Sequence, residues 1–119
     1  GIVVHEGGTV VVIQGPRFST RSESRWFTSM GWEVINMTQY PECYLAREMG
    51  MGYAMIAVIT DWDVGLEGDP SITPVTHEEV IKVFTDNNDK LKNLLHKMIP
   101  KISEKASDLC RDVLKGARF

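Results

Sequence analysis

A short, uninterrupted run of apolar and β-branched residues near the start of the chain limits its fold most strongly. The run TVVVI at residues 9–13 lies between Gly7-Gly8 and Gly15-Pro16. A run that is apolar on both faces is typical of a buried strand in a parallel sheet, because such a strand is covered on both sides. Two further strand-like runs follow, at residues 32–36 and 53–59. The sequence therefore predicts three buried strands.

Helix signals separate and follow these strands. Thr20 with Glu23, and Thr76 with Glu79, have the Thr-x-x-Glu spacing of a capping box, in which each residue satisfies a backbone N–H of the other. They predict helices from residue 20 to about 30 and from residue 76 to about 95. Further helices are expected over residues 41–50, with proline in the first turn, and over 102–114, after a break at Pro100. The order β-α-β-α-β-loop-α-α predicts an α/β fold, a right-handed sheet flanked by helices, formed by residues 1–119 as a single domain.

Composition and charge exclude several classes of protein. The net charge is −3, so the chain lacks the basic excess of proteins that bind nucleic acid or anionic membranes. No apolar run approaches the roughly 20 residues that a membrane span requires. Cys43 and Cys110 are far apart and lack the CxxC spacing or a disulfide-rich pattern. We therefore expect reduced thiols in a cytoplasmic protein.

Polar residues follow each predicted strand, and ligands of α/β sheets bind beyond these carboxyl ends. After the first strand, Phe18 could stack on a base or could join the core of a tight turn. Arg17 and Arg21 could bind phosphate or could lie in water. After the second strand, Asn36 and Thr38 could line a sugar and an anion, or could make only local hydrogen bonds.

The third strand is followed by two carboxyl groups, Asp61 and Asp63, separated by one residue. They could point toward one ligand, and one of them could act as a general acid. Alternatively, Asp61 caps a turn and Asp63 is solvated. A metal site lacks support because no further carboxylates or histidines cluster nearby. His77 would join this group if the loop of residues 61–75 folds back, and would otherwise lie on the surface.

Three segments together resemble one enzyme family. They are GPRFSTRSES at residues 15–24, VINMT at 34–38 followed by Pro41-Glu42, and TDWD at 60–63. In sequence and order they are similar to the carboxyl-terminal half of the purine nucleoside phosphorylases, in particular those that cleave methylthioadenosine. The resemblance extends from about Gly8 to about Leu95. It implies pentosyltransferase activity, in which phosphate attacks the ribose of S-methyl-5′-thioadenosine and releases adenine and 5-methylthioribose 1-phosphate. No cofactor is implied besides phosphate as co-substrate.

The resemblance also implies roles for individual residues. Asp61 would hydrogen-bond to N7 of the purine or protonate it, and Asp63 would accept a hydrogen bond from the 6-amino group. Thr38 would bind phosphate, and no residue would bind a metal. The residues expected around the purine and the ribose are Phe18, Ser19, Ile35, Asn36, Met37, His77, Val80 and Ile81.

The resemblance favours one substrate class and leaves the 5′ group open. Relatives that act on 6-oxopurines carry glutamate and asparagine where this chain has Ser19 and Asp61, so a 6-aminopurine is favoured. Val80 and Ile81 resemble residues that accommodate a methylthio group, whereas His77 resembles the histidine that binds a 5′-hydroxyl. An adenosine-type purine nucleoside phosphorylase is therefore the alternative. A non-catalytic fragment that binds adenine nucleosides is another, and hydrolysis by water is disfavoured by the motif match.

Other parts of the family pattern are not found in this chain. The Gly-rich phosphate loop and the Arg-His phosphate pair belong to the amino-terminal half of the family's enzymes. We therefore expect the chain to be the carboxyl-terminal part of a phosphorylase, inactive alone. It would act with the missing amino-terminal half, in a trimer or hexamer, and an isolated half-sheet would tend to associate or unfold.

Overall fold

The computed structural model describes residues 3–65, 69–103, 105, 110, 112 and 114–116. Its elements are β1 (Val10–Val12), α1 (Arg21–Ser29), β2 (Val34–Asn36), α2 (Gln39–Glu48), α3 (His77–Met98) and the 3₁₀ helix η1 (Ile99–Lys101). β1 and β2 are parallel, with Val11 opposite Ile35. The predicted α/β class is confirmed.

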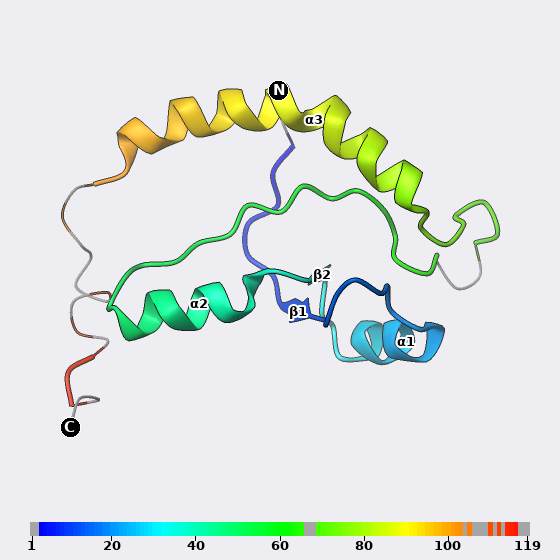
Figure 1. Cartoon of the computed structure of the whole chain (residues 1–119), viewed down its shortest axis with the longest axis horizontal. Coiled ribbons are helices and arrows are strands. Elements are labelled where there is room, and N and C mark those ends of the chain that lie inside the picture. The colour runs from blue at the N-terminus through cyan, green and yellow to red at the C-terminus, as the bar shows by residue number, and fades with distance from the viewer. Residues whose placement is uncertain are drawn as a thin grey trace.

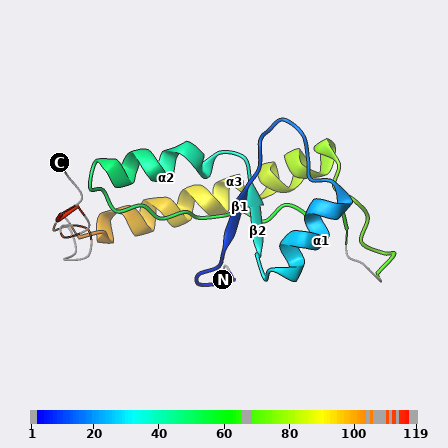
Figure 2. The ribbon, with the colours of Figure 1, turned by 90° about the horizontal axis from the view of Figure 1, so that it is seen from below.

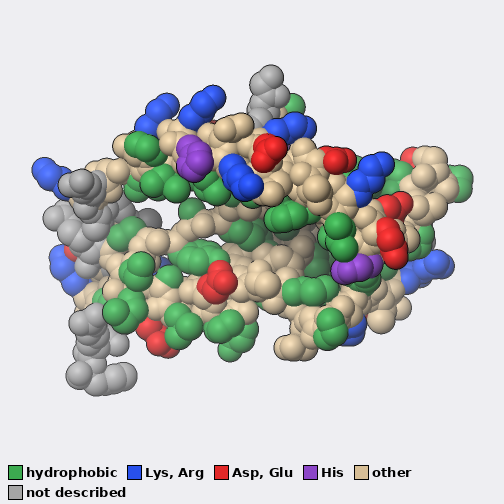
Figure 3. All heavy atoms as spheres, turned by 45° about the horizontal axis from the view of Figure 1, so that its top comes forward, with side chains coloured by type: hydrophobic (Ala, Val, Ile, Leu, Met, Phe, Trp, Pro, Cys, Tyr) green, Lys and Arg blue, Asp and Glu red, His purple; other side chains and the backbone are tan. Residues whose placement is uncertain are grey.

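The long helix α3 lies across the molecule. Residues 51–61 run as an extended segment between α3 and the part that contains α1, β1, β2 and α2 (Figure 1). Seen from below, α2 and α3 both extend toward one end of the molecule, and α1 lies toward the other (Figure 2). Charged side chains cover the outer face of α3, and hydrophobic side chains gather along the seam beneath it (Figure 3). Among the described helices, none is long and apolar enough to cross a membrane.

The predicted third strand, residues 53–59, is not a strand in the structure. The segment is extended, but in the described part of the chain no backbone hydrogen bond joins it to β1 or β2. The described sheet therefore has two strands, and the predicted order is wrong at this element. The physical reason is that a strand is defined by a hydrogen-bonded neighbour as well as by its apolar sequence. Without one, Ile59 remains 62% exposed.

The helix boundaries agree well with the predictions. Both capping boxes form at the N-termini of α1 and α3. The helical conformation of α2 begins after Tyr40, whose φ of −95° and ψ of 129° are extended, so Pro41 lies in the first helical turn as predicted. The break at Pro100 is confirmed, because α3 ends at Met98 and η1 follows. The predicted helix over residues 102–114 lies largely outside the described residues.

The core is small. Of the hydrophobic side chains that the structure describes, only Ile13 and Phe27 are buried. Phe27 packs against Trp26 and Trp32, with ring centroids 5.7 and 6.0 Å apart. Val12 is 36% exposed, so the prediction of buried strands is also wrong. The reason is that the described helices make few contacts with the sheet.

Candidate functional site

Three connections that carry predicted site residues lie at the same end of the molecule. Figures 1 and 2 both place the β1–α1 connection, the end of the extended segment and the beginning of α3 there. The N–H of Val75 donates to the carbonyl of Asp63, with an N···O distance of 2.8 Å. The loop between Asp63 and α3 therefore folds back, which is the condition on which His77 was expected to join the site.

A tight turn holds the two carboxyl groups that follow the extended segment. Asp61 Oδ1 accepts a hydrogen bond from the N–H of Asp63 at 2.8 Å, and Asp61 Oδ2 accepts one from Thr60 Oγ1 at 2.5 Å. Asp63 has a φ of 54°, in the left-handed region that aspartate tolerates better than most residues. Asp63 Oδ2 is buried and has no hydrogen-bond partner within the described structure. Asp61 therefore caps a turn, as one reading of the sequence expected, while Asp63 is not simply solvated.

The β1–α1 connection presents one aromatic ring and one buried hydroxyl. Phe18 is 42% exposed, as a ring that stacks on a ligand must be. Ser19 is only 8% exposed, and its Oγ also has no partner among the residues the structure describes. A buried hydroxyl without a hydrogen bond costs free energy, so such a group needs an explanation, and a bound ligand is one.

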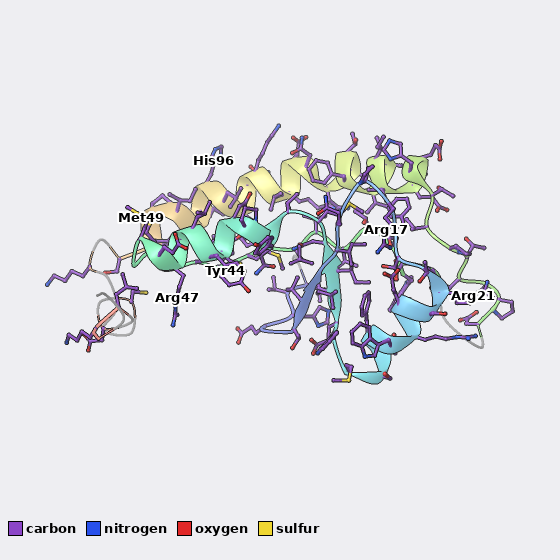
Figure 4. All side chains as sticks on the ribbon, turned by 60° about the horizontal axis from the view of Figure 1, so that its bottom comes forward. Arg17, Arg21, Tyr44, Arg47, Met49 and His96 are labelled. Carbon is purple, nitrogen blue, oxygen red and sulfur yellow. The ribbon has the colours of Figure 1, made fainter. Side chains whose placement is uncertain are left out.

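An ion pair that sequence reasoning missed lies beside this connection. Arg17 binds the carboxylate of Glu23 through both terminal nitrogens, at 2.7 and 2.8 Å, and Figure 4 shows Arg17 near the beginning of α1. The arginine and the N–H and hydroxyl of Thr20 lower the pKa of Glu23 from 4.5 to about 2, because all of them favour the ionised carboxylate. The missed signal is the capping box itself, since it turns Glu23 back toward the residues before the helix.

Residues after β2 connect several parts of the molecule. The side-chain amide of Asn36 donates to Gln39 Oε1 at 3.2 Å and to Met55 Sδ at 3.1 Å. Met37 packs against Gly15, where a Cβ would come within 2.9 Å of the Met37 sulfur. The β1–α1 and β2–α2 connections therefore touch each other.

The remaining predicted residues lie as follows. Thr38 is exposed at the N-cap of α2, and its hydroxyl makes no capping hydrogen bond. Ile35 is half-buried within β2. His77, Val80 and Ile81 occupy the first turns of α3, where residues three and four apart share a face. No hydrogen bond in the described part of the chain joins Phe18 or Ser19 to the carboxyl groups or to these α3 residues.

A separate hollow of about 410 Å³ lies between β1 and α2. Met37 is the one predicted site residue among those that line it, which are Val10, Val12, Ile13, Gln14, Met37, Gln39, Tyr40, Cys43 and Tyr44. Tyr44 projects from α2 in Figure 4. The lining is a mixture of polar and apolar groups and holds neither of the two carboxyl groups. Within the described residues, no group of three His, Cys, Asp or Glu side chains could hold a metal ion.

Two parallel strands with flanking helices define an α/β protein, and ligands of α/β sheets bind beyond the carboxyl ends of such strands. The model of the Phosphorylase superfamily matches residues 1–100. Because that match covers most of the sequence, the chain belongs to the phosphorylase superfamily, and the resemblance to phosphorylases is confirmed.

Individual relatives show which members of the superfamily this chain is similar to. S-methyl-5′-thioadenosine phosphorylase from Pyrococcus abyssi is 50% identical over 115 residues, 97% of this chain and 42% of the relative. Purine nucleoside phosphorylase from Streptomyces coelicolor is 47% identical over 90 residues, 76% of this chain and 31% of the relative. The solved structure of methylthioadenosine phosphorylase from Schistosoma mansoni in complex with adenine is 32% identical, with a TM-score of 0.78 over 93% of this chain and 39% of that one. The chain thus spans about two fifths of the length of the first of these relatives.

Proposed function

We propose that this chain forms the purine- and ribose-binding part of an S-methyl-5′-thioadenosine phosphorylase. The observation that carries the proposal is that two oxygens at predicted positions, Ser19 Oγ and Asp63 Oδ2, are buried and have no partner in the described part of the chain. Purines offer hydrogen-bonding groups along the edge of a flat ring, which suits buried oxygens that have no partner in the protein, and Phe18 supplies an exposed aromatic ring. The 50% identity to a phosphorylase of that name supports the substrate class.

In the proposed reaction, a phosphate oxygen forms a bond to C1′ of the ribose while the bond from C1′ to N9 of adenine breaks. The bonding electrons pass into the purine ring, and a proton at N7 makes the base a better leaving group. An ionised carboxylate can only accept hydrogen bonds, so contact between Asp61 and N7 requires a proton between them. Asp61 is suited to hold that proton in place, because Thr60 and Asp63 fix the orientation of its carboxyl group.

The other side chains bind and orient the nucleoside. Asp63 Oδ2 accepts a hydrogen bond from the 6-amino group, and Phe18 covers a face of the base. Met37 lines the ribose with Ile35 and Asn36 beside it. Thr38 donates its hydroxyl to phosphate, which is consistent with its lack of a capping bond. Inorganic phosphate is the co-substrate, and no other cofactor or metal enters the proposal.

The chain does not supply the whole reaction in this proposal. One hydroxyl provides little binding energy for a doubly charged phosphate, and orientation of the reactants accounts for much of such catalysis. The expected partner is the amino-terminal half of a phosphorylase, in a cytoplasmic trimer or hexamer. Residues 1–119 would then be the carboxyl-terminal part of one domain.

An adenosine-type purine nucleoside phosphorylase is the second candidate. His77 lies on the first turn of α3, one turn before Ile81. An imidazole can hydrogen-bond to a 5′-hydroxyl, whereas Val80 and Ile81 suit a methylthio group. The relative from Streptomyces coelicolor carries the name purine nucleoside phosphorylase, which keeps this candidate open.

The decisive experiment measures adenine release from methylthioadenosine and from adenosine, with and without phosphate. It is run on the chain alone and on the chain mixed with a second polypeptide. That polypeptide is the part of the Pyrococcus abyssi relative that this chain does not match. We expect phosphate-dependent release only in the mixture, and faster release from methylthioadenosine. Faster release from adenosine would favour the second candidate. Adenine binding without turnover in the mixture would reduce the function to nucleoside binding.

A further inference from the structure

The ion pair beside the β1–α1 connection does more than complete a helix cap. Besides Glu23, Arg17 Nη1 donates to the carbonyl of Phe18 at 3.1 Å. The carboxylate of Glu23 also accepts hydrogen bonds from the N–H and the hydroxyl of Thr20, at 2.7 and 2.9 Å. Glu23 therefore bonds to Arg17 and to Thr20, the residues immediately before and immediately after the dipeptide Phe18-Ser19.

The second capping box of the chain shows what a cap needs. At the start of α3, Glu79 accepts hydrogen bonds from the N–H and the hydroxyl of Thr76 at 3.1 and 2.9 Å, and Thr76 Oγ1 accepts the N–H of Glu79 at 3.3 Å. Within the described part of the chain, no arginine pairs with Glu79. A complete capping box therefore forms without an arginine, and Arg17 adds a contact that the cap of α1 does not require.

We propose that Arg17 and Glu23 are positioning residues for the purine site, where their ion pair fixes Phe18 and Ser19 in the orientation that receives the base. The inference rests on the proposed function. Two parallel N–H···O bonds between a guanidinium and a carboxylate define a geometry as well as an attraction. Because the Arg17 side chain is 52% exposed, we expect the pair to add little to global stability and to act on local geometry.

The geometry of Phe18 and Ser19 depends on such support. Phe18 is not buried in the core, so its packing does not fix the ring. The direction of Ser19 Oγ follows the backbone of the same short connection. A displacement of this backbone would move the ring and the hydroxyl together, and small displacements of binding groups reduce affinity.

Four variants separate positioning from capping. Glu23→Gln keeps a side chain that can complete a capping box, but it removes the charge that holds Arg17. Arg17→Met removes the guanidinium donors, and Arg17→Lys keeps the positive charge without the bidentate hydrogen-bonding geometry. Glu79→Gln makes the same change in the capping box of α3 and is the matched control.

The test measures adenine affinity by titration calorimetry, on the chain mixed with the complementary polypeptide. Adenine is the probe because it lacks the ribose and 5′ group that α3 would contact. We expect Glu23→Gln and Arg17→Met each to bind about fivefold more weakly, the scale of one lost orienting contact. Arg17→Lys should lie between these and the unchanged protein, and Glu79→Gln should bind normally. The double variant of Arg17→Met with Glu23→Gln should be no weaker than either single variant, because both remove the same pair.

A second readout needs no ligand. Backbone ¹⁵N relaxation of the labelled chain, mixed with the complementary polypeptide, should show larger fast motions at Phe18 and Ser19 in Glu23→Gln, and no change there in Glu79→Gln. Equal loss of adenine affinity in these two variants, or additive losses in the double variant, would overturn the inference. If the unchanged protein does not bind adenine, the proposed function fails. Unchanged relaxation at Phe18 and Ser19 in Glu23→Gln would then overturn the positioning role independently.

Discussion

The carboxylate of Asp61 accepts a hydrogen bond from the backbone N–H of Asp63, with 2.8 Å between Oδ1 and N. This bond forms a turn in which Asp63 has a positive φ, and one of its carboxylate oxygens is buried without a partner among the residues that the structure describes. The two aspartates therefore differ in their surroundings although they are separated by one residue. Asp61 is bonded within the turn, whereas Asp63 Oδ2 is the acceptor that the proposed function assigns to the 6-amino group of the purine.

This difference predicts separate effects of substitutions at Asp61. Asp61→Asn keeps an oxygen that accepts the Asp63 N–H but cannot deliver a proton to N7, whereas Asp61→Ala also loses the turn. In the assembled enzyme, we expect Asp61→Asn to lower kcat roughly 100-fold, the scale of lost general acid catalysis, with little change in adenine affinity. Asp61→Ala should lower both. Steady-state kinetics and adenine titration test this, and a normal kcat in Asp61→Asn would exclude Asp61 as the group that serves N7.

The Arg17–Glu23 pair predicts a pH effect of definite sign. The pKa of Glu23 falls from 4.5 to about 2, with the hydrogen bond from Arg17 as the largest cause and those from Thr20 next. Because the folded-state pKa is the lower one, the stabilising contribution is complete above about 4.5 and is lost as the pH falls toward 2. NMR titration of the Glu23 carboxyl carbon should give a midpoint near 2, and Arg17→Met should raise it. A midpoint that Arg17→Met leaves unchanged would show that the pair does not form in solution.

Local signals in the sequence predicted local structure correctly. The Thr-x-x-Glu spacing located the starts of α1 and α3, and Pro41 and Pro100 marked a helix start and a helix break. These signals act within one turn of the chain, so the sequence contains all the interacting groups. The segment at residues 53–59 shows the limit, because its apolar residues require a hydrogen-bonded neighbour that local sequence does not identify.

The candidate site shows the same limit. The polar residues at the ends of the strands were identified from the sequence, and the resemblance to phosphorylases gave them roles. The pairing of Arg17 with Glu23, six positions apart, was missed, since it depends on how the connection bends before the helix. The contact of Asn36 with Met55 likewise depends on the path of the extended segment.

Two glycines with positive φ give a matched test of the loop that brings α3 to the site. Gly31 has a φ of 71° and open space where a Cβ would lie, whereas Gly65 has a φ of 91° and the Ile72 carbonyl oxygen 2.7 Å from that position. Gly31→Ala should cost roughly 1–2 kcal/mol, the usual cost of the left-handed conformation. Gly65→Ala should also displace the loop, because backbone cannot yield as a side chain can. We expect lower nucleoside affinity in Gly65→Ala only, measured by titration alongside urea unfolding. Equal nucleoside affinities in the two variants would show that this loop does not contribute to the nucleoside site.

The start of α3 predicts how the 5′ group is selected. His77 and Ile81 are four residues apart on one helix face, so a single bound nucleoside could contact both. His77→Ala should weaken adenosine binding about fivefold through one lost hydrogen bond, and should leave methylthioadenosine binding nearly unchanged. Ile81→Ser should do the reverse, because it removes apolar contact with the methylthio group. Competition titrations of both nucleosides against adenine measure the two ratios in one experiment. If both substitutions shift the two nucleosides equally, this turn of α3 does not distinguish the 5′ groups.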